Sequence, residues 1–121
     1  MKKRILIVED ESSILDLLVL LLSREGYEVY SCQNGREAVA EMKKVHPHMV
    51  ILDVMLPGLD GNSIVKIMSE DEMLESTPVI ITSALVESER LFKQYPQVKG
   101  FASKPFALTS FLAMVKKFIG D

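Results

Sequence analysis

Residues 49–53 read MVILD, four apolar residues followed directly by an aspartate. Three other segments also end a short apolar run on a polar side chain: residues 4–10 read RILIVED, residues 79–83 read VIITS and residues 100–104 read GFASK. Strands that are apolar throughout are typical of parallel sheets covered on both faces. Because the carboxyl ends of parallel strands share one edge of the sheet, Asp53 should meet two further acids, a hydroxyl and an ammonium there.

The rest of the chain alternates such runs with segments of helical spacing. The expected strands are residues 4–9, 27–31, 49–53, 79–83 and 99–103. The last helix has the clearest apolar stripe, formed by Leu108, Phe111, Leu112, Val115, Phe118 and Ile119. Since parallel crossovers are almost always right-handed, five strand-helix units predict a doubly wound α/β fold, a three-layer sandwich with helices on both faces of the sheet.

Three helix ends carry specific expectations. The first helix should begin at Ser12 or Ser13, either of which could cap it. The fourth helix, expected over residues 86–95, has the weakest pattern, and Pro96 should end it early. Ala107 stands where the last helix needs a cap and offers no side-chain acceptor, so its first turn should be less well fixed.

Length and composition favour a single domain, residues 1–121, because 121 residues with 48% apolar content fill one core and not two. A net charge of -3 gives no basic surface for nucleic acid. The only cysteine, Cys32, allows neither an internal disulfide nor a thiolate metal site, which fits a reducing cytoplasm. Residues 17–22 are too short to span a bilayer and no signal peptide is readable, so a soluble protein without a membrane partner is expected.

The acids predict a phosphoryl-transfer chemistry. A carboxylate can accept a phosphoryl group as a nucleophile, but another negatively charged group must then approach it. Glu9, Asp10 and Asp53 supply the hard oxygen ligands that Mg²⁺ prefers, and such an ion would offset this repulsion. Three clustered acids without a cation would raise at least one pKa. The residues alone leave the hydroxyl open, because Thr82 and Ser83 are neighbours that point to opposite sides of a strand.

Two further features are interpreted structurally. His46 and His48 have no cysteine or acid at ligand spacing, so they are expected to be loop residues rather than metal ligands. Leu17, Val19 and Leu20 lie beyond the main stripe of the first helix. Burial between the sheet and the last helix is expected for them in preference to a partner contact.

Four blocks carry a family resemblance. They are ILIVEDE at residues 5–11, LDVMLPGLDG at 52–61, PVIITSA at 78–84 and KPF at 104–106. Together they resemble the receiver domain of bacterial two-component response regulators, of the chemotaxis-regulator type, over essentially the whole chain. The resemblance implies a flavodoxin-like (βα)5 fold with five parallel strands in the order 2-1-3-4-5, acting as a phosphorylation-dependent switch rather than an enzyme.

The resemblance also implies roles for individual residues. Asp53 matches the phosphoacceptor and Asp10 a direct ligand of Mg²⁺, for which Mn²⁺ is a substitute. Glu9 matches the other acidic position, where its longer side chain would reach the ion through water. Met55 would contribute its backbone carbonyl. Lys104 would pair with the acids at rest and with a phosphoryl oxygen afterwards.

Three more positions match the switching machinery of the family. Ser83 is chosen as the switch hydroxyl because it follows Pro78 by five residues and precedes Ala84. Phe101, three residues before Lys104, matches the aromatic switch position. Pro105 directly follows this lysine and matches a position that is preceded by a cis peptide bond in the family.

Two departures from the family pattern affect expected behaviour. Pro96, Gln97 and Val98 replace the usual glycine-containing turn, so the fourth helix should be short or displaced, which bears on the signalling face that it helps to form. Met55 and Leu85 occupy the two variable positions beside the acceptor and the hydroxyl, and neither side chain can orient a water. Slow self-dephosphorylation is therefore expected.

The implied partners are a histidine kinase or histidine phosphotransfer protein and a downstream protein or fused output domain, with a phosphorylation-dependent dimer also compatible. The chain stops just after the last helix, so no output region is expected within it, and both a stand-alone receiver and an excised domain remain open. A haloacid-dehalogenase-type phosphohydrolase would carry a second aspartate where Met55 stands. Flavin binding would need a glycine- and hydroxyl-rich phosphate loop after the first strand.

Overall fold

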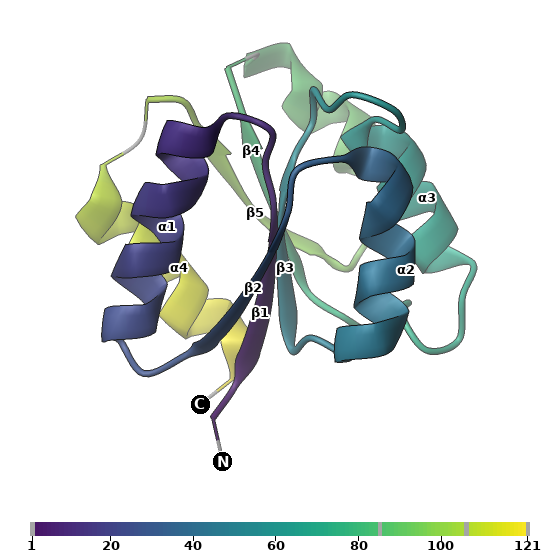
Figure 1. Cartoon of the computed structure of the whole chain (residues 1–121). Coiled ribbons are helices and arrows are strands. Elements are labelled where there is room, and N and C mark those ends of the chain that lie inside the picture. The colour runs from purple at the N-terminus through teal and green to yellow at the C-terminus, as the bar shows by residue number, and fades with distance from the viewer. Residues whose placement is uncertain (1, 85, 106, 121) are drawn as a thin grey trace.

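The computed structural model describes residues 2–84, 86–105 and 107–120, a five-stranded parallel sheet with helices on both faces (Figure 1). The strands are β1 (Arg4–Val8), β2 (Glu28–Cys32), β3 (Met49–Asp53), β4 (Val79–Ser83) and β5 (Val98–Ser103), in the spatial order β2-β1-β3-β4-β5. The helices are α1 (Ser12–Arg24), α2 (Gly35–Val45), α3 (Gly61–Ser69), the 3-10 helix η1 (Val86–Phe92) and α4 (Leu108–Ile119). The fold class and strand order are confirmed, and each predicted strand is present to within one residue at either end.

Alternate residues of the central strands enter two separate cores, which explains why these strands are apolar throughout. Ile5, Ile7 and Ile51 pack under α1 and α4. Leu6 and Leu52 point the other way, toward α2 and α3. All five residues of β3 are buried, so this central strand presents its last side chain, an aspartate, from the most enclosed part of the sheet.

One expectation about helix ends was wrong, and two are confirmed. Neither serine caps α1: Glu11 holds the N-cap position, its side chain accepts no capping hydrogen bond from a backbone N–H, and Ser12 is already the first helical residue. The fourth helix is not an α-helix but a 3-10 helix that ends at Phe92. Pro96 explains its shortness, because proline lacks an N–H and restricts the residue before it. The uncapped start of α4 at Ala107 is confirmed.

The turn before β5, where the family usually has a glycine, is held by a buried glutamine. The side-chain nitrogen of Gln97 donates hydrogen bonds to the carbonyl oxygens of Leu74 and Thr77, at 3.0 and 2.9 Å. These two bonds join the turn after η1 to the segment that leads into β4. Gln97, which departs from the family pattern, therefore has a structural role in this turn.

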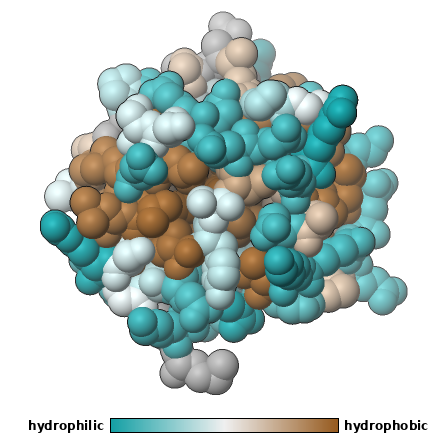
Figure 2. Space-filling view, in the orientation of Figure 1, coloured by the Kyte–Doolittle hydropathy of each residue, from teal (hydrophilic) through white to brown (hydrophobic). Residues whose placement is uncertain are grey.

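The exposed face of α1 is more apolar than expected. Leu17 and Leu20 are 45% and 51% exposed, so the expectation that they are buried between the sheet and the last helix was wrong, whereas Val19 is half-buried against the core on that side. Figure 2 shows the resulting hydrophobic patch over α1. Leu17 also lines a mainly apolar hollow with Ile14, Pro105 and Leu108, beside the carboxyl edge of the sheet. No helix in the described part of the chain is both long and apolar enough to cross a membrane.

His48 joins the loop before β3 to the start of β1. The Arg4 backbone N–H donates to Nδ1 of His48 at 2.9 Å, and the His48 backbone N–H donates to the Arg4 carbonyl at 2.8 Å. Only the neutral imidazole can accept the first bond. The pKa of His48 is lowered from its ordinary value of 6.5 by burial and by the positive charges of Arg4 and Lys3.

This contact predicts a pH dependence of stability. Because the folded pKa of His48 lies below the unfolded one, its contribution is fully present above the ordinary pKa of 6.5 and is lost as the pH falls below it. Urea unfolding of the wild type and of His48→Asn should therefore be compared between neutral pH and about pH 5. Asparagine offers an oxygen for the same hydrogen bond but does not titrate, so the variant should lose less stability on acidification. Equal losses in both proteins would contradict this role for His48.

Candidate functional site

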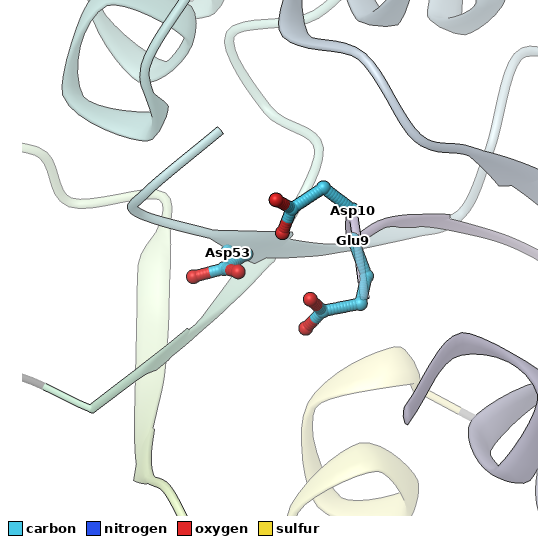
Figure 3. A group of neighbouring side chains, drawn as sticks. All are labelled: Glu9, Asp10 and Asp53. Atoms are coloured by element: carbon cyan, nitrogen blue, oxygen red, sulfur yellow. The ribbon is translucent and has the colours of Figure 1, made fainter. Parts of the chain in front are cut away.

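Four polar groups meet at the carboxyl edge of the sheet. Glu9 and Asp10 follow β1, Asp53 ends β3 and Lys104 follows β5. One carboxylate oxygen from each acid lies within 4.8 Å of one from each of the others, and Figure 3 shows the acids gathered at this edge. Glu9 and Asp53 are buried while Asp10 is exposed, so the cluster opens to solvent on the side of Asp10.

Lys104 lies between the two buried carboxylates. Its Nζ is 2.7 Å from Oε1 of Glu9 and 3.1 Å from Oδ2 of Asp53. Its backbone N–H donates to the Ser83 carbonyl at 2.7 Å, which fixes the start of the β5–α4 loop to the end of β4. The peptide bond between Lys104 and Pro105 is cis, as the resemblance implied. The pairing of Lys104 with the acids is therefore present in the structure.

Backbone groups satisfy the remaining oxygens of the buried acids. The Glu11 N–H donates to Oε2 of Glu9 at 3.1 Å, and the Met55 N–H donates to Oδ1 of Asp53 at 3.2 Å. Each of these carboxylates therefore accepts one bond from Lys104 and one from a main-chain N–H. Hydrogen bonds of this kind favour the charged form of a buried acid.

Burial and charge act in different directions on the ionisable groups. The pKa of Glu9 is raised, first because burial disfavours the carboxylate and also because Asp53 is negative, although Lys104 and the Glu11 N–H oppose the shift. Burial by itself would lower the pKa of Lys104, but its hydrogen bonds with Glu9 and Asp53 and their negative charges raise it overall. The lysine is therefore held as an ammonium, and further positive charge beside Glu9 would favour its carboxylate form.

The loop after β3 is built to keep Asp53 in place. The Asp60 carboxylate caps α3 by accepting the Ser63 N–H at 2.8 Å, and the Gly61 N–H donates to the Val54 carbonyl at 2.9 Å. A Cβ on Gly61 would lie 2.7 Å from the Asp53 carbonyl oxygen, so only glycine lets α3 start this close to the site. The last two residues of the LDVMLPGLDG block therefore have structural roles: Asp60 caps α3, and Gly61 allows close packing against the end of β3.

The strand register bears on the choice between Thr82 and Ser83. Ile81 belongs to the core under α2, α3 and η1, against which Phe101 also packs. Because side chains alternate along a strand, Ser83 is on the same face as Ile81 and therefore as Phe101, whereas Thr82 is on the other. Both hydroxyl residues are 1% exposed, so burial does not separate them. The register supports Ser83 as the partner of the aromatic position.

A hollow of about 550 Å³ is lined by residues that directly follow Asp53, and sequence reasoning missed part of its wall. Met55 lines it together with Asn62 at the start of α3 and Leu91 of η1. No periodicity or spacing connects these positions, because the contact exists only when η1 lies beside the β3–α3 loop. Leu85, the other expected neighbour of the hydroxyl, and Phe106 of the KPF block are outside the described residues.

The donor set fits a magnesium ion. Glu9, Asp10 and Asp53 offer only carboxylate oxygens, and no nitrogen or sulfur ligand belongs to the group. Mg²⁺ favours hard oxygen ligands and usually retains several waters, which the exposed side of the cluster allows. The same residues that the sequence predicted as metal ligands are thus brought together.

The sheet order, the acids and the lysine define a class of protein that the comparisons identify. Residues 5–116 match the family described as the response regulator receiver domain. The chain belongs to this family. It is therefore a receiver domain of two-component signal transduction, a phosphorylation-dependent signalling switch and not a classical enzyme, and its acidic cluster fits the phosphorylation site. Phosphorylation and Mg²⁺ are features of the family.

Individual relatives agree with this assignment. The chain is 30% identical to the polar-differentiation response regulator DivK of Brucella ovis, with 100% of this chain and 99% of DivK covered. It is 32% identical to the alkaline phosphatase synthesis transcriptional regulatory protein PhoP of Bacillus subtilis, covering 98% of this chain but 49% of PhoP. The structure of chemotaxis protein CheY4 of Vibrio cholerae superposes with a TM-score of 0.89 at 27% identity, covering 98% of this chain and 99% of CheY4. The chemotaxis-regulator-like receiver predicted from sequence is confirmed.

Proposed function

We propose that Asp53 is the phosphoacceptor and that a histidine kinase or histidine phosphotransfer protein is its donor. The observation that carries this is the position of Asp53, the buried carboxylate at the end of the central strand, shared between Lys104 and the Met55 N–H. An oxygen of Asp53 forms a bond to phosphorus as the bond from phosphorus to the donor's imidazole nitrogen breaks. Glu9 and Asp10 accept no phosphoryl group in this proposal.

The chain's own residues prepare and hold the acyl phosphate. Lys104, now bound to Glu9 and Asp53, transfers one of its hydrogen bonds to a phosphoryl oxygen. Glu9, Asp10, Asp53 and the Met55 backbone carbonyl would hold Mg²⁺, with Mn²⁺ as a substitute. When bound, the ion supplies positive charge that offsets the repulsion between carboxylate and phosphoryl oxygens.

Ser83 and Phe101 convert the new charge into a surface change. The Ser83 hydroxyl donates a hydrogen bond to the phosphoryl group, and Phe101 on the same face of the sheet moves inward behind it. The common face of these two residues and the half-buried state of Phe101 support this pair. The surface that changes includes η1 and β5, next to Phe101.

The phosphoryl group is lost slowly in this proposal. Met55 is the first exposed residue after Asp53 in the sequence. Its side chain carries no group that can orient an attacking water. Slow hydrolysis suits a switch whose signal must persist until a partner binds.

The proposal treats residues 1–121 as one receiver unit acting in the cytoplasm. Its outputs are a downstream protein or a fused output domain, with a phosphorylation-dependent dimer as a further form. The buried, free thiol of Cys32 is compatible with a reducing compartment.

The phosphoacceptor is tested by incubation with acetyl phosphate and Mg²⁺, followed by intact-mass measurement. The wild type should gain one phosphoryl group and Asp53→Asn none. Asp16→Asn is the matched control, since Asp16 is exposed on α1 and should be labelled like the wild type. An unlabelled wild type, or labelling of Asp53→Asn, would contradict the proposal. Catalytic turnover of phosphate esters without stable labelling would instead favour a phosphohydrolase.

A further inference from the structure

Met55 is an unusually accessible methionine for a residue so close to a functional site. It is 61% exposed, whereas Met42, Met49 and Met68 are fully buried. Its backbone N–H donates to Oδ1 of Asp53 at 3.2 Å, so the Met55 backbone is fixed next to that carboxylate. The hollow of about 550 Å³ that it lines is large enough for several water molecules or a small oxidant.

We propose that Met55 is a redox modification site that controls how long the phosphoryl group stays on Asp53. The oxidant is hydrogen peroxide. The Met55 sulfur attacks one peroxide oxygen, an S–O bond forms as the O–O bond breaks, and the other oxygen leaves as water with both protons. The sulfur is oxidised by two electrons to the sulfoxide and the peroxide is reduced by two. The inference rests on the proposed role of Asp53.

The modification changes the chemistry of the hollow. A thioether is a weak hydrogen-bond acceptor, whereas the sulfoxide oxygen is polar and accepts strongly. On Met55 this oxygen can accept a proton of a water that approaches the aspartyl phosphate from the hollow, a role that the unmodified side chain cannot perform. One added hydrogen bond in the transition state corresponds to an acceleration of about fivefold.

Met73 provides a matched control within the same chain. It is 55% exposed, and its backbone N–H donates to Oδ1 of Asp71, also two residues earlier, at 2.9 Å. Met73 lies before the amino end of β4, whereas Met55 follows the carboxyl end of β3. The two methionines therefore share similar exposure and the same kind of backbone hydrogen bond, but they lie toward opposite edges of the parallel sheet. Peroxide should oxidise both, and only Met55 should affect the phosphoryl group.

The experiment compares the lifetime of phosphorylated protein before and after oxidation. Protein treated with hydrogen peroxide is freed of oxidant, its sulfoxides are located by peptide mass, and it is then labelled with acetyl phosphate and Mg²⁺. Loss of the label is followed by intact mass after removal of the donor. Oxidation should shorten the lifetime about fivefold in the wild type and in Met73→Leu, and methionine sulfoxide reductase should reverse the effect. In Met55→Leu the oxidised and unoxidised forms should decay alike.

Several results would overturn the inference. These are an unoxidised Met55 when Met73 is oxidised, an unchanged or longer lifetime after Met55 is oxidised, and a shortened lifetime that persists in Met55→Leu. An untreated wild type that takes no label would contradict the proposed function and this inference together. Normal labelling with a lifetime insensitive to oxidation would contradict the inference alone.

Discussion

Replacing Lys104 with methionine is expected to lower the free energy of unfolding by about 2 kcal/mol in metal-free buffer. The ammonium lies 2.7 Å from Glu9 and 3.1 Å from Asp53, and methionine keeps the unbranched chain up to the ε-carbon while removing the charge. Two carboxylates would then remain buried with only backbone donors. The effect should be smaller than the roughly 3–5 kcal/mol of a fully buried pair, because the lysine side chain is 16% exposed.

Two further measurements separate this charge effect from a packing effect. The double variant with Asp53→Asn should lose less stability than the sum of the single changes predicts, because removing one acid lowers the demand for the lysine. Mg²⁺ should stabilise Lys104→Met more than it stabilises the wild type, since the cation no longer competes with an ammonium for the same oxygens. Additive losses, together with equal stabilisation by Mg²⁺ in both proteins, would show that the lysine acts through its alkyl chain only.

Changing Gly35 to alanine is expected to cost about 3 kcal/mol or more of unfolding free energy. Gly35 is the first residue of α2, and its N–H donates to the Pro57 carbonyl at 3.0 Å. An added Cβ would lie 1.7 Å from the Leu59 carbonyl oxygen, a backbone atom that cannot rotate away. The β3–α3 loop would have to move as a unit, and this loop carries Met55 beside the site.

Denaturant unfolding tests this prediction against a neighbouring position. Glu37→Ala changes an exposed side chain in the same first turn of α2 and should alter stability by no more than about 0.5 kcal/mol. The midpoint of Gly35→Ala should fall well below that of Glu37→Ala. Similar midpoints for the two variants would mean that the contact between α2 and the β3–α3 loop is not tight in solution.

Local sequence was sufficient where one physical rule dominated. The apolar runs identified the three central strands, β1, β3 and β4, because a strand covered on both faces cannot tolerate alternation. The four polar strand ends identified the site, since parallel strands bring their carboxyl ends to one edge. Ser83 could be preferred only through the family spacing, because Thr82 offers the same hydroxyl one residue earlier.

The sequence was less informative about the ends and geometry of helices and about the contacts of turns. Ser12 and Ser13 are good capping residues, yet Glu11 occupies the N-cap and the helix starts without a side-chain cap. The early end of the helix before Pro96 was predicted correctly, but its 3-10 geometry was not. The sequence showed that Gln97 stands in the turn where the family usually has a glycine, but not that its side chain bonds to carbonyls 20 and 23 residues earlier.

The amino-acid sequence by itself determined the doubly wound fold, the acidic cluster and its lysine. The alternation of apolar strands with helices can be read along the chain, and it implies parallel strands whose carboxyl ends share one edge. Only the tertiary structure decided that Lys104 forms ion pairs with both Glu9 and Asp53. It also decided that Met55 and Leu91 line the same hollow. These contacts join residues from different strands, loops and helices. Their distances depend on how closely the elements pack, which no local pattern encodes.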